Sequence, residues 1–183
     1  MIDLARKCIM KITQLNKDTY SGQKFTLTYT TNGYYDITPI ETGFQITYNS
    51  FDEPKEMSFS DIFFNEWLDE PIAFGAFENG QLLGYVEGSL EKWNNRYRIS
   101  NICVFDNTKR HAGIGTLLMQ TILTEAEKSG ARMVVLETQT CNENAIAFYK
   151  KHGFNIIGFD LYAYTNTDPK RHEVRIEMGK MLR

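Results

Sequence analysis

The sequence has no long run of apolar residues, although 42% of its 183 residues are hydrophobic. A helix that crosses a bilayer needs about 20 consecutive apolar residues, so neither a membrane-spanning helix nor a membrane partner is expected. Residues 1–8, Met-Ile-Asp-Leu-Ala-Arg-Lys-Cys, also lack the apolar segment that is typical of a signal peptide. Together these absences predict a cytoplasmic protein.

Cysteine and histidine are scarce, with three residues of each. Cys8, Cys103 and Cys141 are odd in number and show no paired spacing, which favours reduced thiols over a disulfide framework. The histidines are scattered and have no Cys or His partner at the spacing of metal ligands. We therefore expect neither disulfides nor a bound metal.

The chain also lacks a basic block, and its formal net charge is −3 with a pI of about 5.7. Binding to nucleic acid requires clustered Lys and Arg side chains that neutralise phosphates, so a nucleic-acid partner is disfavoured. Mild acidity is compatible with a cationic substrate, although so small a charge decides little.

Strand and turn patterns alternate in the N-terminal third, residues 1–70. Lys24–Tyr48 is rich in Thr, Tyr, Phe and Ile and predicts two or three short strands, with Asn32-Gly33 as a hairpin turn. Asp52-Glu53-Pro54 interrupts this pattern. A short, largely buried helix is then expected over residues 61–68, with a preceding serine as its N-terminal cap.

The following segment predicts a three-stranded antiparallel meander. Its strands are expected at residues 72–77, 81–90 and 96–105, and Asn79-Gly80 supplies a strong signal for the first hairpin turn. Apolar residues at helical spacing then predict a helix over residues 113–129.

The rest of the chain alternates strands with one further helix. The expected elements are a strand at 132–138 that is buried on both faces, a helix at 142–152, and strands at 154–164 and 173–178. The predicted fold class is α/β (α+β), in a single domain over residues 1–183 with its core at about 72–164.

Two glycines at the start of the 113–129 helix form a candidate phosphate site. The first turn of a helix presents unpaired N–H groups and the positive end of the helix dipole. Gly113 and Gly115 leave room for a ligand to approach the backbone, and Arg110 adds positive charge. The alternative is an ordinary connection in which the glycines allow tight packing. Neither a P-loop nor the three-glycine dinucleotide pattern is present.

Two motifs in this region resemble those of the GNAT superfamily of N-acetyltransferases. Residues 110–115, Arg-His-Ala-Gly-Ile-Gly, are similar to the family's R/Q-x-x-G-x-G/A motif, which binds the pyrophosphate of acetyl-CoA. Residues 142–154 resemble its N-x-x-A-x-x-F-Y-x-K-x-G-F segment. The resemblance implies a mixed, mostly antiparallel sheet flanked by helices, which splays where acetyl-CoA inserts. It covers residues 72–164 well and the N-terminal third poorly.

Further segments resemble the streptothricin acetyltransferases, which acetylate an amino group on the β-lysine arm of an antibiotic. These segments are residues 93–96, 102–106, 136–139, 158–160 and 173–180. The resemblance implies a small cationic amine as acceptor and antibiotic resistance as the biological role. Another small amine, or a protein Lys or N-terminus, is the alternative acceptor. A non-catalytic acyl-CoA sensor is the alternative from a different class of protein.

The GNAT resemblance implies roles for several residues. Tyr149 would protonate the departing CoA thiolate, whereas the alternative is a core tyrosine packed on Phe154. Asn142 would bind the pantetheine arm or serve only as a helix cap, and the backbone of Val104 would polarise the acetyl carbonyl. The residues expected at the acetyl-CoA site are Cys103, Val104, Phe105, Arg110, His111, Ala112, Gly113, Ile114, Gly115, Thr116, Asn142, Ala145 and Tyr149.

The general base has no candidate at the position that some family members use. Ile99 stands where those enzymes place a glutamate. Glu87 and Glu137 are the best substitutes and Asp160 is the third, although each could be only an ion-paired or solvated carboxylate, and water could carry the proton instead. The residues expected to bind the cationic substrate are Glu87, Glu91, Trp93 and Asp160. The N-terminal third is left as either a substrate lid or a homodimer surface.

Overall fold

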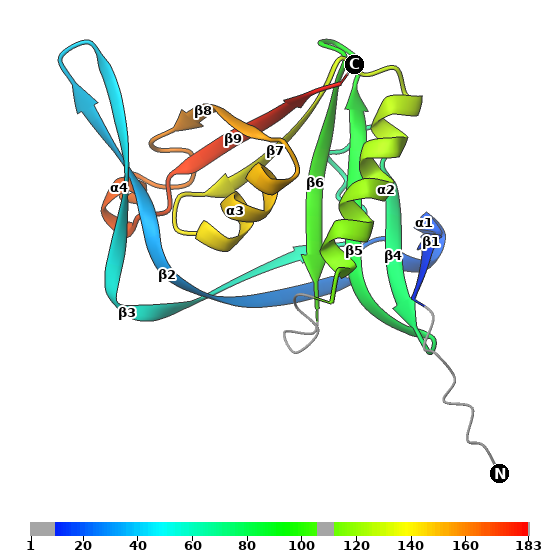
Figure 1. Cartoon of the computed structure of the whole chain (residues 1–183). Coiled ribbons are helices and arrows are strands. Elements are labelled where there is room, and N and C mark those ends of the chain that lie inside the picture. Colours follow the sequence, from blue (N-terminus) through cyan, green and yellow to red (C-terminus); the bar gives the residue numbers. More distant parts are fainter. Residues whose placement is uncertain (1–9, 106–111, 183) are drawn as a thin grey trace.

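A seven-stranded sheet in the order β1-β4-β5-β6-β7-β9-β8 forms the centre of the molecule (Figure 1). The structure, a computed structural model, describes residues 10–105 and 112–182. The strands of the sheet are β1 (Lys11–Gln14), β4 (Ile72–Glu78), β5 (Gln81–Glu91), β6 (Arg96–Val104), β7 (Met133–Gln139), β8 (Asn155–Asp160) and β9 (Arg175–Met181). β6 and β7 run parallel, and the other neighbouring strands of this sheet are antiparallel. The expected mixed, mostly antiparallel sheet is therefore confirmed.

The sheet divides between β6 and β7. These strands pair only where Arg96–Ile99 lies beside Met133–Leu136, and no pairing continues to their C-terminal ends. At this point β6 carries an extra residue, because Gly88 of β5 pairs with Ile99 but Glu87 pairs with Asn101. Such a bulge bends and twists a strand. We call the region where the two strands diverge the split; it is visible in Figure 1.

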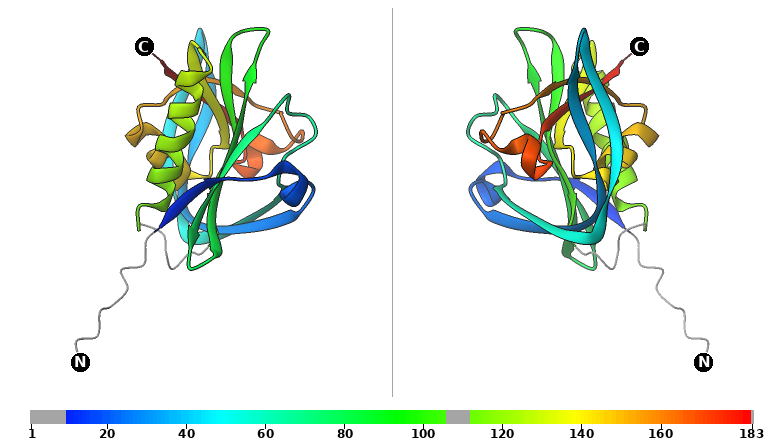
Figure 2. Two further views of the ribbon diagram at one scale, coloured as in Figure 1. Left: turned by 90° about the vertical axis from the view of Figure 1, so that its right-hand side faces the viewer. Right: turned by 90° about the vertical axis from the view of Figure 1, so that its left-hand side faces the viewer.

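Two helices cover one face of the sheet, which we call the helical face. They are α2 (Ile114–Lys128) and α3 (Glu143–Lys151), and Figure 2 shows both on the same side. Buried residues of α2 at helical spacing, including Leu118 and Ile122, pack with Val86, Val134 and other strand residues in one core. α2 ends before Gly130, whose φ of +73° suits a glycine cap. Among the described residues, no helix is long and apolar enough to cross a membrane.

A second, aromatic-rich core lies on the opposite face, which we call the open face. It joins Phe25, Phe63 and Phe64 to Tyr85 and Cys103 of the sheet. The short helices α1 (Lys17–Tyr20) and α4 (Asp168–Arg171) and the segment 63–71 lie on this side (Figure 2). Residues that face this side therefore lie away from α2 and α3.

The N-terminal third forms a long two-stranded ribbon, and the expected hairpin at Asn32-Gly33 is wrong. β2 (Lys24–Ile40) and β3 (Gly43–Ile62) reverse at residues 41–42 instead. The pairing jumps from Thr31↔Lys55 to Gly33↔Ser50, so residues 51–54 have no partners in β2. The Asn-Gly pair therefore marks a bulge, and the Asp-Glu-Pro segment interrupts the ladder without ending the strand.

The helix expected over residues 61–68 is also wrong. β3 continues to Ile62, and an irregular segment follows it. Ser60 does not cap a helix, because its hydroxyl is 2.8 Å from the Thr26 hydroxyl across the ribbon. Phe63 and Phe64 are buried in the second core, whereas Trp67 remains 65% exposed. Dense apolar residues here fill one face of a sheet rather than one side of a helix.

We expect Leu118→Ala to lower the free energy of unfolding by about 2–5 kcal/mol, because Leu118 is 0% exposed and the change leaves a cavity under α2. Leu117→Ala is the matched control. This side chain is 40% exposed, so its removal should cost no more than about 1 kcal/mol. Urea unfolding measures both, and equal losses would contradict the placement of α2.

Candidate active site

The N-terminus of α2 opens toward solvent without a side-chain cap from the described residues. Gly113 precedes the helix with a φ of +85°, and a Cβ added there would meet nothing within 4 Å. Tight packing therefore does not explain Gly113, whereas a Cβ at Gly115 would approach the ring of Phe148 at 3.4 Å. The N–H groups in the first turn of α2 can thus donate hydrogen bonds to a bound anion. Arg110 and His111 lie outside the described residues, so their predicted roles are not placed.

The β6 side of the split ends with three residues that were predicted to contact the ligand: Cys103, Val104 and Phe105. Val104 pairs with Gly84 of β5, and the Phe105 amide donates to the Leu83 carbonyl at 2.9 Å. On its other side this part of β6 pairs with no strand in the described chain. Backbone polar groups need partners, so an extended ligand carrying amides can pair with β6 here.

The opposite side of the split is formed by α3 and the residue that caps it. The Asn142 side chain accepts a hydrogen bond from the Ala145 amide at 3.3 Å, which confirms its role as a helix cap. Tyr149 is buried, and its ring lies 6.2 Å from that of Phe154. Burial raises the pKa of Tyr149 and the nearby Cys103 thiol raises it further. The phenol is therefore protonated at neutral pH.

The β2–β3 ribbon crosses the split and contacts both sides (Figure 1). On the β6 side, the ring of Phe25 lies 5.7 Å from that of Phe105. On the α3 side, the backbone N–H of Asn32 donates to Glu143 at 2.7 Å, and Tyr48 donates to the other carboxylate oxygen. These hydrogen bonds outweigh burial and lower the pKa of Glu143. The ribbon therefore holds the first turn of α3 beside the split, a role that the sequence analysis did not predict.

Glu87 is a fully buried carboxylate on the open face, beside the residue at which the split begins. Its Oε2 accepts a hydrogen bond from the Ser100 hydroxyl at 3.2 Å, whereas its Oε1 has no hydrogen-bond partner among the described residues. Burial raises the pKa of Glu87, and the neighbouring Tyr85 and Ser100 side chains oppose this shift without cancelling it. Ser100, the extra residue of the β6 bulge, thus places its hydroxyl within hydrogen-bonding distance of Glu87.

Asp61 is a second carboxylate at this site, which the sequence analysis missed. It accepts a hydrogen bond from the Asn101 side chain at 2.9 Å and another from Asn65 at 3.0 Å. Asn101 pairs with Glu87 across the strands, and the charge of Asp61 contributes to the raised pKa of Glu87. Asp61 ends a ribbon strand, and only the folded ribbon brings it to β6. No pattern local to residue 61 could have indicated this.

Glu91 is the last residue of β5, and two arginines balance the negative charge of its carboxylate. Its carboxylate binds Arg96 at 3.1 Å and also binds Arg98, while both arginines reach Glu177 of β9. Burial alone would raise the pKa of Glu91, but the hydrogen bonds from Arg98 and Asn94 outweigh it and lower the pKa. The predicted binding of a cationic substrate by Glu91 would therefore have to compete with Arg96 and Arg98.

Glu137 of β7 and Asp160 of β8 are the other predicted carboxylates. They share one arginine, Arg175 of β9, on the side of the split opposite β6. Arg175 lies 3.7 Å from Glu137 and 4.0 Å from Asp160. The side chain of Glu137 is 44% exposed and that of Asp160 is 50% exposed. They remain open to solvent, whereas Glu87 does not. The structure therefore does not bring Glu87, Glu91, Glu137 and Asp160 into one cluster.

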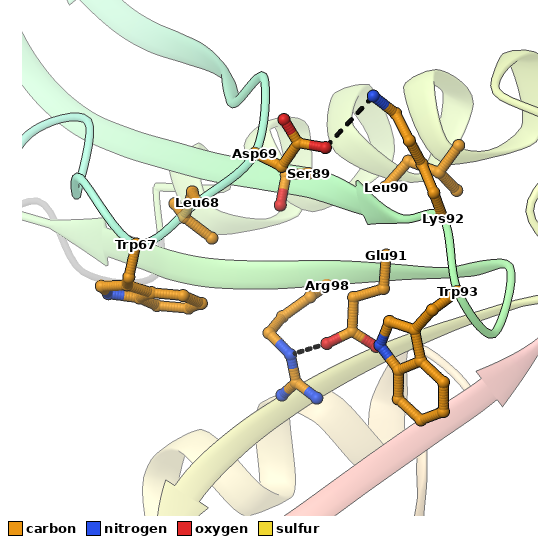
Figure 3. A pocket seen from close by; sticks show the side chains of 9 residues that line it. All are labelled: Trp67, Leu68, Asp69, Ser89, Leu90, Glu91, Lys92, Trp93 and Arg98. Carbon is orange, nitrogen blue, oxygen red and sulfur yellow. Dashed lines mark hydrogen bonds and ion pairs between the residues drawn. The ribbon is translucent and has the colours of Figure 1, made fainter.

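Two adjoining cavities follow the open face from the split to the β5–β6 turn. The smaller, of about 200 Å³, is lined by Trp67, Arg98, Glu137, Arg175 and Glu177. The larger, of about 310 Å³, is lined by Trp67, Leu68, Asp69, Ser89, Leu90, Glu91, Lys92, Trp93 and Arg98 (Figure 3). Trp67 and Arg98 belong to both cavities. Within the described residues, no three His, Cys, Asp or Glu side chains gather closely enough to hold a metal.

The chain matches the acetyltransferase (GNAT) family over residues 40–154, more than half of its length. It is 29% identical over 130 residues to streptothricin acetyltransferase of Escherichia coli, which covers 71% of this chain and 72% of that protein.

Two solved structures share the fold. Nourseothricin acetyltransferase has a TM-score of 0.73 at 25% identity, over 94% of this chain and 98% of that one. A Bacillus anthracis protein assigned as a streptothricin acetyltransferase, solved in complex with acetyl coenzyme A, has a TM-score of 0.69 at 24% identity, over 96% and 99%. The expected fold is thus confirmed along almost the whole chain.

We expect Glu87→Gln to stabilise the protein increasingly as the pH rises. The raised pKa means that the folded protein holds this proton more tightly than the unfolded chain does. Wild type therefore loses stability as the pH rises from about 4.5 through the raised pKa, whereas glutamine does not titrate. Urea unfolding of both proteins from about pH 4 to pH 8 measures the difference.

Glu91→Gln is the matched control, on the same strand and with the opposite sign. Because the pKa of Glu91 is lowered, wild type should be more stable than this variant above about pH 4.5 and should lose that advantage as the pH falls through the lowered pKa. The same pH dependence in both variants would contradict the electrostatics described for Glu87.

Proposed function

The chain belongs to the acetyltransferase (GNAT) family, and on that premise we propose that it acetylates a primary amine of a small cationic substrate. The preferred substrate is a streptothricin-type antibiotic, acetylated on its β-lysine arm. Similarity to streptothricin acetyltransferase of E. coli and to the structure of nourseothricin acetyltransferase supports this choice. In this proposal the protein is a resistance enzyme.

The observation that carries the proposal is the convergence of three features at the split. Within the described residues, the N-terminus of α2 has no side-chain cap, and the end of β6 has no strand partner on the side of β7. Tyr149 belongs to α3, on the opposite side of the split. These features suit an elongated ligand with phosphates at one end and amides along its length, as acetyl-CoA has. When bound, acetyl-CoA supplies the thioester carbonyl carbon that an amine attacks.

The contacts to acetyl-CoA are divided among the elements at the split. The N–H groups that follow Gly113, including those of Gly115 and Thr116, would hold the phosphates. The exposed backbone edge near Val104 would pair with the pantetheine amides and polarise the acetyl carbonyl, and such oxyanion stabilisation is usually a large term. Asn142 would add a side-chain contact from the α3 side.

Two buried groups would move the protons. Glu87 would accept a proton from the substrate ammonium at Oε1, the oxygen that lacks a partner among the described residues. Burial brings its pKa closer to neutral pH, which suits a general base. Tyr149 would hold a proton at its hydroxyl for the departing thiolate, and burial keeps that phenol protonated. Glu137, the first residue of β7 beyond its pairing with β6, is the alternative base.

The substrate side is proposed to be the open face. Glu137 and Asp160 are two exposed carboxylates there, and each exposed ion pair contributes only about 0.2–1 kcal/mol, so several must act together. Trp93 and Glu91 line the larger cavity on the same face. A cationic arm could thus reach the split while the rest of the substrate lies along the cavities.

The test is a free-thiol assay with acetyl-CoA and a panel of acceptors. Thiol release with streptothricin at a kcat/KM well above that for lysinamide, spermidine or a peptide N-terminus would support the proposal. Release only with the other amines would assign a different acceptor. Absence of release with any amine, together with saturable binding of acetyl-CoA, would instead indicate a sensor.

Replacing Tyr149 with Phe should lower kcat by about 100-fold, because the leaving thiolate loses its proton donor, and change the KM for acetyl-CoA much less. Tyr97→Phe is the matched control. Tyr97 is also buried, and its hydroxyl has no hydrogen-bond partner among the described residues, but it lies on β6 where β6 is still paired with β7. Unchanged kcat in Tyr149→Phe would exclude the proposed role.

A further inference from the structure

Both tryptophans of the chain line the larger cavity on the open face. The sequence contains two, Trp67 and Trp93, and they are 65% and 84% exposed. Figure 3 shows their rings on opposite sides of the cavity, with Glu91 and Arg98 between them. Single exposed apolar residues are common on protein surfaces, but apolar side chains gathered at one place mark binding sites, where Trp is enriched. Their shared position therefore indicates a binding surface.

The polar groups of this cavity are balanced in charge. Asp69 and Glu91 supply two carboxylates, while Lys92 and Arg98 supply two cations. Lys92 lies 3.1 Å from Asp69, and Arg98 binds Glu91, so each charge already has a partner of opposite sign. A charged ligand would have to break one of these pairs. A neutral ligand with hydroxyl or amide groups can use the remaining acceptor and donor positions without breaking them.

We propose that this cavity binds a neutral polar ring, such as a sugar, that forms the body of the acceptor. A six-membered ring has two flat faces that can stack on indoles and a polar rim that can hydrogen-bond to the paired charges. A volume of about 310 Å³ lies at the lower end of the range for small-molecule sites. Trp67 and Trp93 are thus specificity-determining residues.

This inference rests on the proposed function, because it assigns the ring and the reacting amine to adjoining parts of one site. Trp67 also borders the smaller cavity, which contains Glu137 from beyond the point where β6 and β7 part. A ring held between the tryptophans would therefore direct an attached amine arm past Trp67 toward the split. The arm and the ring are recognised by different residues.

Matched acceptors separate the ring from the arm. Lysinamide carries the amine arm alone, lysyl-glucosamine (joined through an amide) adds a neutral sugar, and the cyclohexylamide of lysine adds an apolar ring. We expect the kcat/KM for lysyl-glucosamine to exceed that for the other two by about five- to tenfold, the contribution of one or two stacking contacts. Equal values for the sugar and the apolar ring would overturn the proposal.

Trp67→Ala and Trp93→Ala should each reduce this advantage of the sugar-bearing acceptor, and Trp67→Phe and Trp93→Phe should retain most of it. Phe44→Ala is the control, because Phe44 is exposed but lies near the ribbon tip and lines neither cavity. A loss that is the same for lysinamide and for lysyl-glucosamine would contradict a role in ring binding.

Intrinsic fluorescence provides a readout that does not require acetyl transfer. Trp93 lines the larger cavity but not the smaller one, so the indole emission of Trp67→Phe, which has no other tryptophan, reports on this cavity alone. Titration with lysyl-glucosamine should give a saturable change that lysinamide does not give. If no amine is acetylated, the proposed function fails while this titration still decides the ring site, and a flat titration overturns the inference.

Discussion

The early end of pairing between β6 and β7 is the constraint on which the rest of the structure depends. One extra residue, Ser100, shifts the register of β6 against β5, and pairing with β7 stops at the preceding residue, Ile99. The same bulge has two effects: it frees one edge of β6 and turns Ser100 and Asn101 toward Glu87 and Asp61. The opening for a ligand and the buried carboxylate therefore have a common structural cause.

A sheet that opens in the middle gives up ladder hydrogen bonds, and the ribbon compensates by joining its two halves. Phe25 packs with Tyr85 and Phe105 on one half, while Asn32 and Tyr48 bind Glu143 on the other. The width of the split is therefore set before any ligand arrives. A site held in its binding geometry loses less conformational freedom on binding, which improves affinity without adding contacts.

Local patterns predicted the elements around the α2 N-terminus well and the ribbon poorly. Asn79-Gly80 forms the expected turn, but the same dipeptide at 32–33 lies in a bulge, because pairing with β3 decides which role an Asn-Gly pair takes. Periodicity located α2 and α3, and motif resemblance correctly indicated the family. Asp61 and Asn101 could not be found, because they meet only through pairing across 40 residues of sequence.

The two sides of the site differ in how the chain builds them. The elements around the α2 N-terminus and Tyr149 come from one continuous stretch of sequence, from β6 through α3. The open-face cavities instead combine the irregular segment after β3 with side chains from β5, β6, β7 and β9. Trp67 lies in that irregular segment, outside the sheet and both long helices. Substitutions there can change one side of the site while leaving the other intact. Over evolutionary time, such a division would let related chains diversify in the molecules they modify while inheriting the donor machinery unchanged.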